Sequence, residues 1–116
     1  MNKLTDKVCL PCKKGGLTLK TEEINEYLNQ ISGTWKNINF HHIEKEFQFK
    51  NFKEALDFTN KVGALAEKEN HHPDINLTWG KVKILLWTHK ISGLTENDFI
   101  LASKIDQLFF MNFDHC

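Results

Sequence analysis

Apolar residues recur along this 116-residue chain with two different periods, and the changes between those periods predict its elements. From residue 21 to residue 31, apolar side chains fall at i, i+3, i+4 and i+7, which predicts an amphipathic helix. Residues 1–20 contain Pro11 and a Gly-Gly pair without such a period, so they are predicted to form an irregular leader. A single domain is expected over residues 21–116.

The rest of that domain alternates between strand and helix patterns. Each of the two later helices begins at a capping side chain, Asn51 and Thr95, and the four strand patterns show a period of two residues. The predicted segments are strands at 35–40 and 43–50, a helix at 51–70, strands at 75–79 and 82–89, and a helix from 95. The sequence therefore predicts an α+β fold of order α-β-β-α-β-β-α, in which three helices pack on one face of a four-stranded antiparallel sheet.

The last helix is more apolar than one core requires. Its main stripe consists of Leu101, Ala102, Ile105, Leu108 and Phe109. Further apolar side chains lie beyond that stripe: Phe99, Phe110, Met111 and Phe113. This surplus predicts contacts between copies of the chain through the last helix.

Composition narrows the classes of partner. Fifteen basic and fifteen acidic residues balance, so the sequence gives no electrostatic sign of nucleic-acid binding. No apolar run approaches the roughly 20 residues of a membrane span, and the first residues lack the apolar centre of a signal peptide. A cytoplasmic protein without membrane or nucleic-acid partners is expected.

Three cysteines are too few and too scattered for a disulfide framework. Cys9 and Cys12 have the spacing of a redox or zinc motif, but a second such pair is missing from the sequence. We interpret them as reduced thiols in a loosely ordered leader.

The candidate chemistry lies in three histidines. His71 and His72 stand where a helical pattern meets Pro73, and His89 closes the last strand pattern. Imidazole titrates near neutral pH, so such a group suits either proton transfer or metal binding. Alternatively, the pair only caps the helix or faces solvent. Glu67 lies four residues before His71 and could reach it if the helix continues.

Two neighbouring features are harder to assign. His41 and His42 lie between two strand patterns without a flanking proline or a paired acid, which predicts a solvated hairpin link. Trp87 shares a strand face with His89, so its indole could form one wall of a site for a planar ligand. A core or interface role for Trp87 is the alternative.

The order of these motifs resembles the pterin-4a-carbinolamine dehydratase family. The resemblance runs from Trp35 almost to the C-terminus and is carried by Glu67-Lys68-Glu69-Asn70-His71-His72-Pro73, by Thr88-His89 and by Gly93-Leu94-Thr95-Glu96-Asn97-Asp98-Phe99. It implies removal of water from 4a-hydroxytetrahydropterin to give quinonoid dihydropterin, in pterin recycling beside aromatic amino-acid hydroxylases. Acid and base groups suffice for that reaction, so the resemblance implies neither a cofactor nor a metal.

The resemblance also implies roles for individual residues. His71, His72 and His89 correspond to the catalytic histidines, while Glu67 and Asp98 correspond to supporting acids. Trp35 corresponds to a ring that lines the substrate pocket, and Asn70 and Thr88 belong to the segments that hold the pterin. Lys90 and Trp79 depart from animal members, which commonly have an acid and a tyrosine there.

Two other functions remain open at this point. A metalloenzyme could use the same three histidines as ligands, which metal analysis of the purified protein would decide. An oligomeric scaffold or coactivator on the same fold would instead bind a partner and have little or no dehydratase role.

Overall fold

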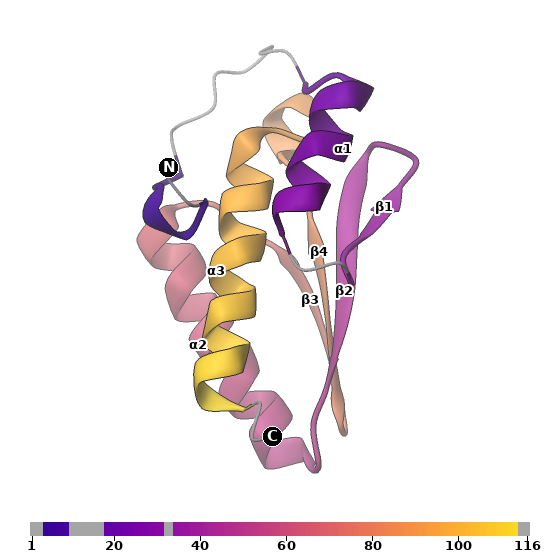
Figure 1. Ribbon diagram of the computed structural model, residues 1–116. Coiled ribbons are helices and arrows are strands. Elements are labelled where there is room, and N and C mark those ends of the chain that lie inside the picture. Colours follow the sequence, from indigo (N-terminus) through magenta and orange to yellow (C-terminus); the bar gives the residue numbers. More distant parts are fainter. Residues whose placement is uncertain (1–3, 10–17, 32–33, 114–116) are drawn as a thin grey trace.

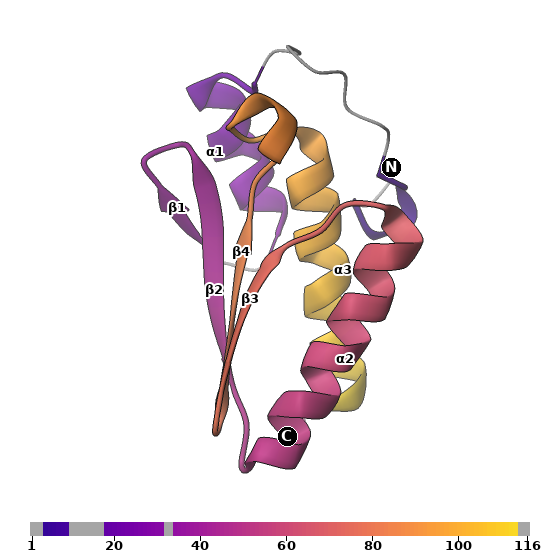
Figure 2. The same cartoon turned by 180° about the vertical axis from the view of Figure 1, so that it is seen from behind.

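A four-stranded antiparallel sheet carries three α-helices on one of its faces (Figures 1 and 2). This computed structural model describes residues 4–9, 18–31 and 34–113. In chain order the elements are η1 (Leu4–Asp6), α1 (Thr21–Gln30), β1 (Lys36–Ile38), β2 (His42–Gln48), α2 (Phe52–Glu69), β3 (Asp74–Thr78), β4 (Lys81–Leu86), η2 (His89–Ile91) and α3 (Glu96–Asn112), where η marks a 3-10 helix. The predicted α+β class and the predicted order of helices and strands are both confirmed.

The sheet has the order β1-β2-β4-β3, with every neighbouring pair antiparallel. Ile43 of β2 lies opposite Leu86 of β4, and Phe47 lies opposite Val82. Residues opposite one another share a face of the sheet, so this register gathers the apolar side chains of both central strands under the helices.

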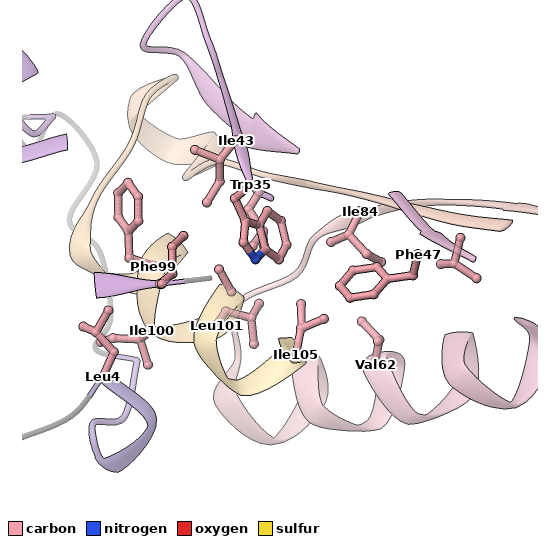
Figure 3. Close-up of a cluster of buried hydrophobic side chains, with 14 of the residues drawn as sticks. Leu4, Trp35, Ile43, Phe47, Val62, Ile84, Phe99, Ile100, Leu101 and Ile105 are labelled. Atoms are coloured by element: carbon pink, nitrogen blue, oxygen red, sulfur yellow. The ribbon is translucent and has the colours of Figure 1, made fainter. Parts of the chain in front are cut away.

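The core lies between that face and the three helices (Figure 3). Val82, Ile84 and Leu86 alternate along β4 and are completely buried, as the period of two residues predicts. Figure 3 shows Trp35 and Phe47 from the sheet side meeting Ile105 of α3. These contacts join segments that lie far apart in the sequence.

One partly buried position on β2 is charged. Lys45 points to the helix-covered face, where its Nζ lies 2.6 Å from Oδ1 of Asp106 on α3. The indole N–H of Trp35 donates to Oδ2 of the same carboxylate at 2.9 Å. The lysine is therefore compatible with the core because its charge is paired there.

The leader differs from its prediction in the part that the structure describes. Leu4 of η1 is buried in the core, and Lys7 forms an ion pair with Glu96 at 2.7 Å. The backbone N–H of Cys9 donates to Oε1 of Glu69 at 2.9 Å. Residues 4–9 are thus held against α2 and α3, whereas Cys12 and Cys116 lie outside the described residues.

The apolar surplus of α3 is smaller than the sequence suggests. Phe99 is completely buried, and Phe113 joins a cluster of aromatic rings with Phe49, Phe58 and Phe109. Phe110 and Met111 stay exposed, at 55% and 75%. Among the described residues, no helix combines the length and apolar character of a membrane span.

Candidate active site

The two adjacent histidines diverge because helix α2 ends in a left-handed residue. Asn70 has φ 52°, and its backbone N–H and that of His71 both bond to the carbonyl of Ala66. Asparagine tolerates this conformation better than most residues, and it turns the chain sharply after the helix. The turn directs His71 toward α3 and leaves His72 at the surface.

His71 is held by a buried carboxylate. Its Nε2 lies 2.6 Å from Oδ1 of Asp98, and the two side chains are 10% and 0% exposed. Oδ2 of Asp98 accepts from the Thr88 hydroxyl at 3.0 Å and from the backbone N–H of Thr95 at 2.9 Å. The hydroxyls of Thr88 and Thr95 are 2.8 Å apart, which completes a four-residue network.

This network also determines how His71 presents its ring. A carboxylate only accepts hydrogen bonds, so the close contact with Asp98 requires the proton on Nε2 of His71. In the neutral ring, Nδ1 is then the nitrogen that can accept a proton. The Asp98 carboxylate therefore selects the tautomer and the orientation of the imidazole.

Local sequence explains why Asp98 and Thr88 meet. Asp98 is the third residue of α3, and its carboxylate caps the helix start at Thr95, where the helix dipole favours a negative charge. Thr88 follows β4 and pairs with Gly93 as an isolated antiparallel bridge. A Cβ on Gly93 would lie 2.3 Å from Cγ2 of Thr18, so this close approach requires glycine.

His72 forms a second acid–imidazole pair at the surface. Its Nε2 contacts Oε2 of Glu67, and the two side chains are 54% and 78% exposed. The sequence indicated that Glu67 could reach His71 only if the helix continued, and α2 ends at Glu69. The helix does not continue to His71, so the carboxylate on the last turns of α2 meets the next histidine instead.

His89 lies just beyond β4, as the first residue of η2. Its ring stacks on Trp87, with ring centroids 4.2 Å apart and an interplanar angle of 27°. The expected neighbourhood of His89 and an indole is therefore present. The strand, however, ends at Leu86, three residues earlier than predicted.

The remaining expected residues lie in different environments. Asn70 is exposed and serves as the cap of α2. Trp35 is only 5% exposed, and its N–H is committed to Asp106, eight residues along α3 from Asp98. The contacts of the described residues thus join Thr88 and Asp98 to His71, and Glu67 to His72, while Trp35 belongs to the core.

The sequence predicted only a helix cap at Thr95 and a solvated link at the hairpin histidines. Thr95 contributes both its N–H and its hydroxyl to the network around Asp98. His41 lies in the turn, but His42 begins β2, and both rings approach Trp87. The Thr-x-x-Asp cap and the strand register are the signals that could have revealed these contacts.

The thiol of Cys9 is poorly suited to chemistry. Burial and, next, the charge of Glu69 raise its pKa to about 12. A thiol with so high a pKa is hardly ionised near neutral pH, so it is a weak nucleophile and a weak metal ligand. Within the described part of the chain, no group of three or more His, Cys, Asp or Glu side chains is arranged to hold a metal ion.

Comparison with known proteins settles the family. The family model for pterin 4 alpha carbinolamine dehydratase matches residues 17–108. The chain belongs to that family. A relative from Alkaliphilus metalliredigens is 58% identical over 107 residues, which cover 92% of this chain and 96% of the relative. Another, from Rubrobacter xylanophilus, is 51% identical over 108 residues and is covered completely, with 93% of this chain aligned. Both carry the provisional name pterin-4-alpha-carbinolamine dehydratase.

Two solved structures are similar to this fold. One is described as a transcriptional coactivator/pterin dehydratase from Brucella melitensis, with a TM-score of 0.74, 31% identity, and coverage of 79% of this chain and 98% of that one. The other is a pterin dehydratase-like protein identified as a RuBisCO assembly factor in the alpha-carboxysome. Its TM-score is 0.56 at 25% identity, with 65% of this chain and 88% of that chain covered.

Proposed function

We propose that this chain is a dehydratase that removes water from 4a-hydroxytetrahydropterin and releases quinonoid dihydropterin. Family membership and the names of the close relatives support this substrate. The observation that carries the proposal is the His71–Asp98 pair, in which a nearly buried imidazole is oriented by a fully buried carboxylate. Such a pair is suited to proton transfer at neutral pH.

The reaction breaks the bond between C4a and its hydroxyl and removes the proton on N5. A general acid protonates the leaving hydroxyl, which departs as water, while a general base accepts the N5 proton. The electron pair of the N5–H bond forms the new double bond between N5 and C4a. No external oxidant or reductant is consumed in this step.

The three histidines are proposed to divide these proton transfers. His71 is the strongest candidate for the base, because Asp98 stabilises the charged ring that forms when Nδ1 accepts a proton. His72 and His89 are exposed, so they can exchange protons with water between turnovers. Glu67 orients His72 in the same way that Asp98 orients His71, with weaker effect at the surface.

The test is the series His71→Ala, His72→Ala and His89→Ala, assayed for carbinolamine dehydration. Each positioned acid or base is typically worth 10²–10⁴-fold in rate, so each change is expected to lower kcat. The losses should be less than additive, because the groups act as a unit. Thermal unfolding provides the control, with stability expected to change by no more than roughly 1–2 kcal/mol. Three folded variants with the kcat of the wild type would contradict the proposal.

A partner-binding scaffold or coactivator is the second candidate. It is favoured by exposed Phe110 and Met111 at the end of α3, and by the descriptions of the two similar structures. A folded variant that lacks all three histidines separates the two functions. Restoration of a deletion strain by that variant would favour the partner role, and failure to restore it would favour the dehydratase.

The cellular setting forms part of the same proposal. We place the enzyme in the cytoplasm, as a homodimer or homotetramer that recycles tetrahydrobiopterin beside an aromatic amino-acid hydroxylase. The acid–base chemistry described above requires no metal and no cofactor. Full dehydratase activity after dialysis against a strong chelator is the expected result.

A further inference from the structure

The indole of Trp87, just beyond the end of β4, is approached by imidazoles from two separate segments. On one side, the ring of His89 stacks on Trp87 at 4.2 Å. The rings of His41 and His42 lie 5.5 Å and 5.8 Å from the same indole, tilted by 41° and 54°. The register of β2 against β4, with Ile43 opposite Leu86, places the hairpin tip beside the end of β4 (Figure 2).

The hairpin that carries His41 and His42 is strained at its tip. Asn39 and Phe40 both have left-handed backbone angles, with φ 53° and 56°. This conformation is uncommon for a residue as bulky as phenylalanine, and it persists only where surrounding contacts enforce it. The Asn37 side chain accepts from the N–H of Phe40 at 2.9 Å, and the Ile38 carbonyl accepts from the N–H of His41 at 3.0 Å.

His89 depends on this cluster more than the other two histidines do. His71 is fixed by Asp98, and His72 is paired with Glu67. His89 is exposed, and within the described part of the chain its ring is held by the stack on Trp87 rather than by a hydrogen bond or an ion pair. An exposed imidazole without such support samples several rotamers.

We propose that Trp87 is a positioning residue for His89, and that the rings of His41 and His42 help to hold the indole in place. The inference rests on the proposed dehydratase function and extends it to residues outside the three histidines. The flat stack restricts the rotation of the His89 ring, so the ring is already oriented when substrate binds. A misplacement of about 1 Å can cost as much as 10²-fold in rate, so orientation of this ring has a measurable value.

The experiment compares Trp87→Leu with Trp87→Phe, and both with Trp79→Leu as a matched control. Trp79 is another tryptophan of the same hairpin, 68% exposed at the turn between β3 and β4, away from His89. Trp87→Leu should lower kcat about tenfold with KM changed less than twofold, whereas Trp87→Phe should retain most of the rate because it retains a ring for stacking. Trp79→Leu should turn over like the wild type.

Two further measurements separate positioning from general destabilisation. In a double-mutant cycle, adding Trp87→Leu to His89→Ala should cause no further loss, because Trp87 acts through His89. In proton NMR, the His89 ring signals are shielded by the stacked indole and should move downfield in Trp87→Leu. The His41→Ala and His42→Ala double variant should produce the same changes to a smaller extent.

The outcomes distinguish failure of the positioning role from failure of the proposed function. If His89→Ala lowers kcat while Trp87→Leu does not, the positioning role is wrong and the proposed function stands. Additive losses in the cycle, or unshifted His89 signals, also overturn the positioning role. If the wild type is inactive, or His89→Ala is as active as the wild type, the proposed use of His89 fails and the inference fails with it.

Discussion

Replacing Asp98 by asparagine tests whether the buried network controls the chemistry of His71. The substitution conserves size and shape, and the amide oxygen can still accept from Thr95 and Thr88. The amide nitrogen, however, would face Nε2 of His71 in place of a carboxylate oxygen. Since an amide nitrogen only donates, Nε2 must lose its proton to keep a hydrogen bond, and the ring must change tautomer.

The substitution is expected to lower both the thermal stability and kcat. One hydrogen bond to a charged group contributes about 1.5–3 kcal/mol, and the charge at the start of α3 contributes roughly 0.3–1 kcal/mol more. For a domain of this size, such a loss lowers Tm by about 10 °C. The wrong tautomer removes the proton acceptor on Nδ1, and the cost in kcat is expected at the lower end of the usual range, about 10²-fold.

The assay follows quinonoid product by rapid absorbance measurements after 4a-hydroxytetrahydropterin is generated in situ. Circular dichroism during heating gives Tm, and long-range ¹⁵N correlation spectra report the tautomer of His71. Asp106→Asn is the matched control: it alters another buried aspartate of α3, which binds Lys45 and Trp35 instead. That control should lose stability without a comparable loss of kcat.

A folded Asp98→Asn variant whose kcat stays within twofold of the wild type would contradict the proposed role of Asp98. The same conclusion would follow if Asp106→Asn lost as much kcat as Asp98→Asn, because the effect would then be general destabilisation. An unchanged ¹⁵N pattern for His71 would show that the carboxylate does not select the tautomer.

Two other predictions concern assembly and acid stability. Phe109 and Phe113 pack inside the aromatic cluster, so self-association is tested at the exposed Phe110 and Met111. The Phe110→Asp and Met111→Asp double variant should lower the mass measured by light scattering. A wild-type protein that is a 13.6 kDa monomer at micromolar concentration would contradict the predicted oligomer. Burial would raise the pKa of Glu69, but hydrogen bonds from Lys104 and from the Cys9 N–H outweigh it and hold the pKa below its ordinary 4.5. That contribution to stability is present above the ordinary pKa and is lost as pH falls through the lower folded value, so Glu69→Gln should flatten the loss of Tm as pH falls below about 5. Parallel curves for the variant and the wild type would exclude this role for Glu69.

The helices, the strands and the fold class can be predicted from the sequence alone. Helix starts at Asn51 and Thr95 follow from short-range caps, and the alternation along β4 follows from the two-residue period of a strand. These signals involve residues that are close in sequence, so they can be read without knowing the fold. The family motif likewise named the three histidines and Asp98 before their geometry was known.

Which side chains meet at the site depends on how the elements pack. Because of the left-handed turn at Asn70, Glu67 contacts His72, and His71 contacts Asp98, which lies 27 residues further along the chain. Strand register, which depends on the pairing of β2 with β4, brings the hairpin histidines to Trp87. Such contacts depend on how whole elements pack, because a small change in one backbone angle or in register redirects a side chain by several ångströms. For that reason the chemical groups of this site could be predicted from the sequence, whereas their partners depend on how the elements pack.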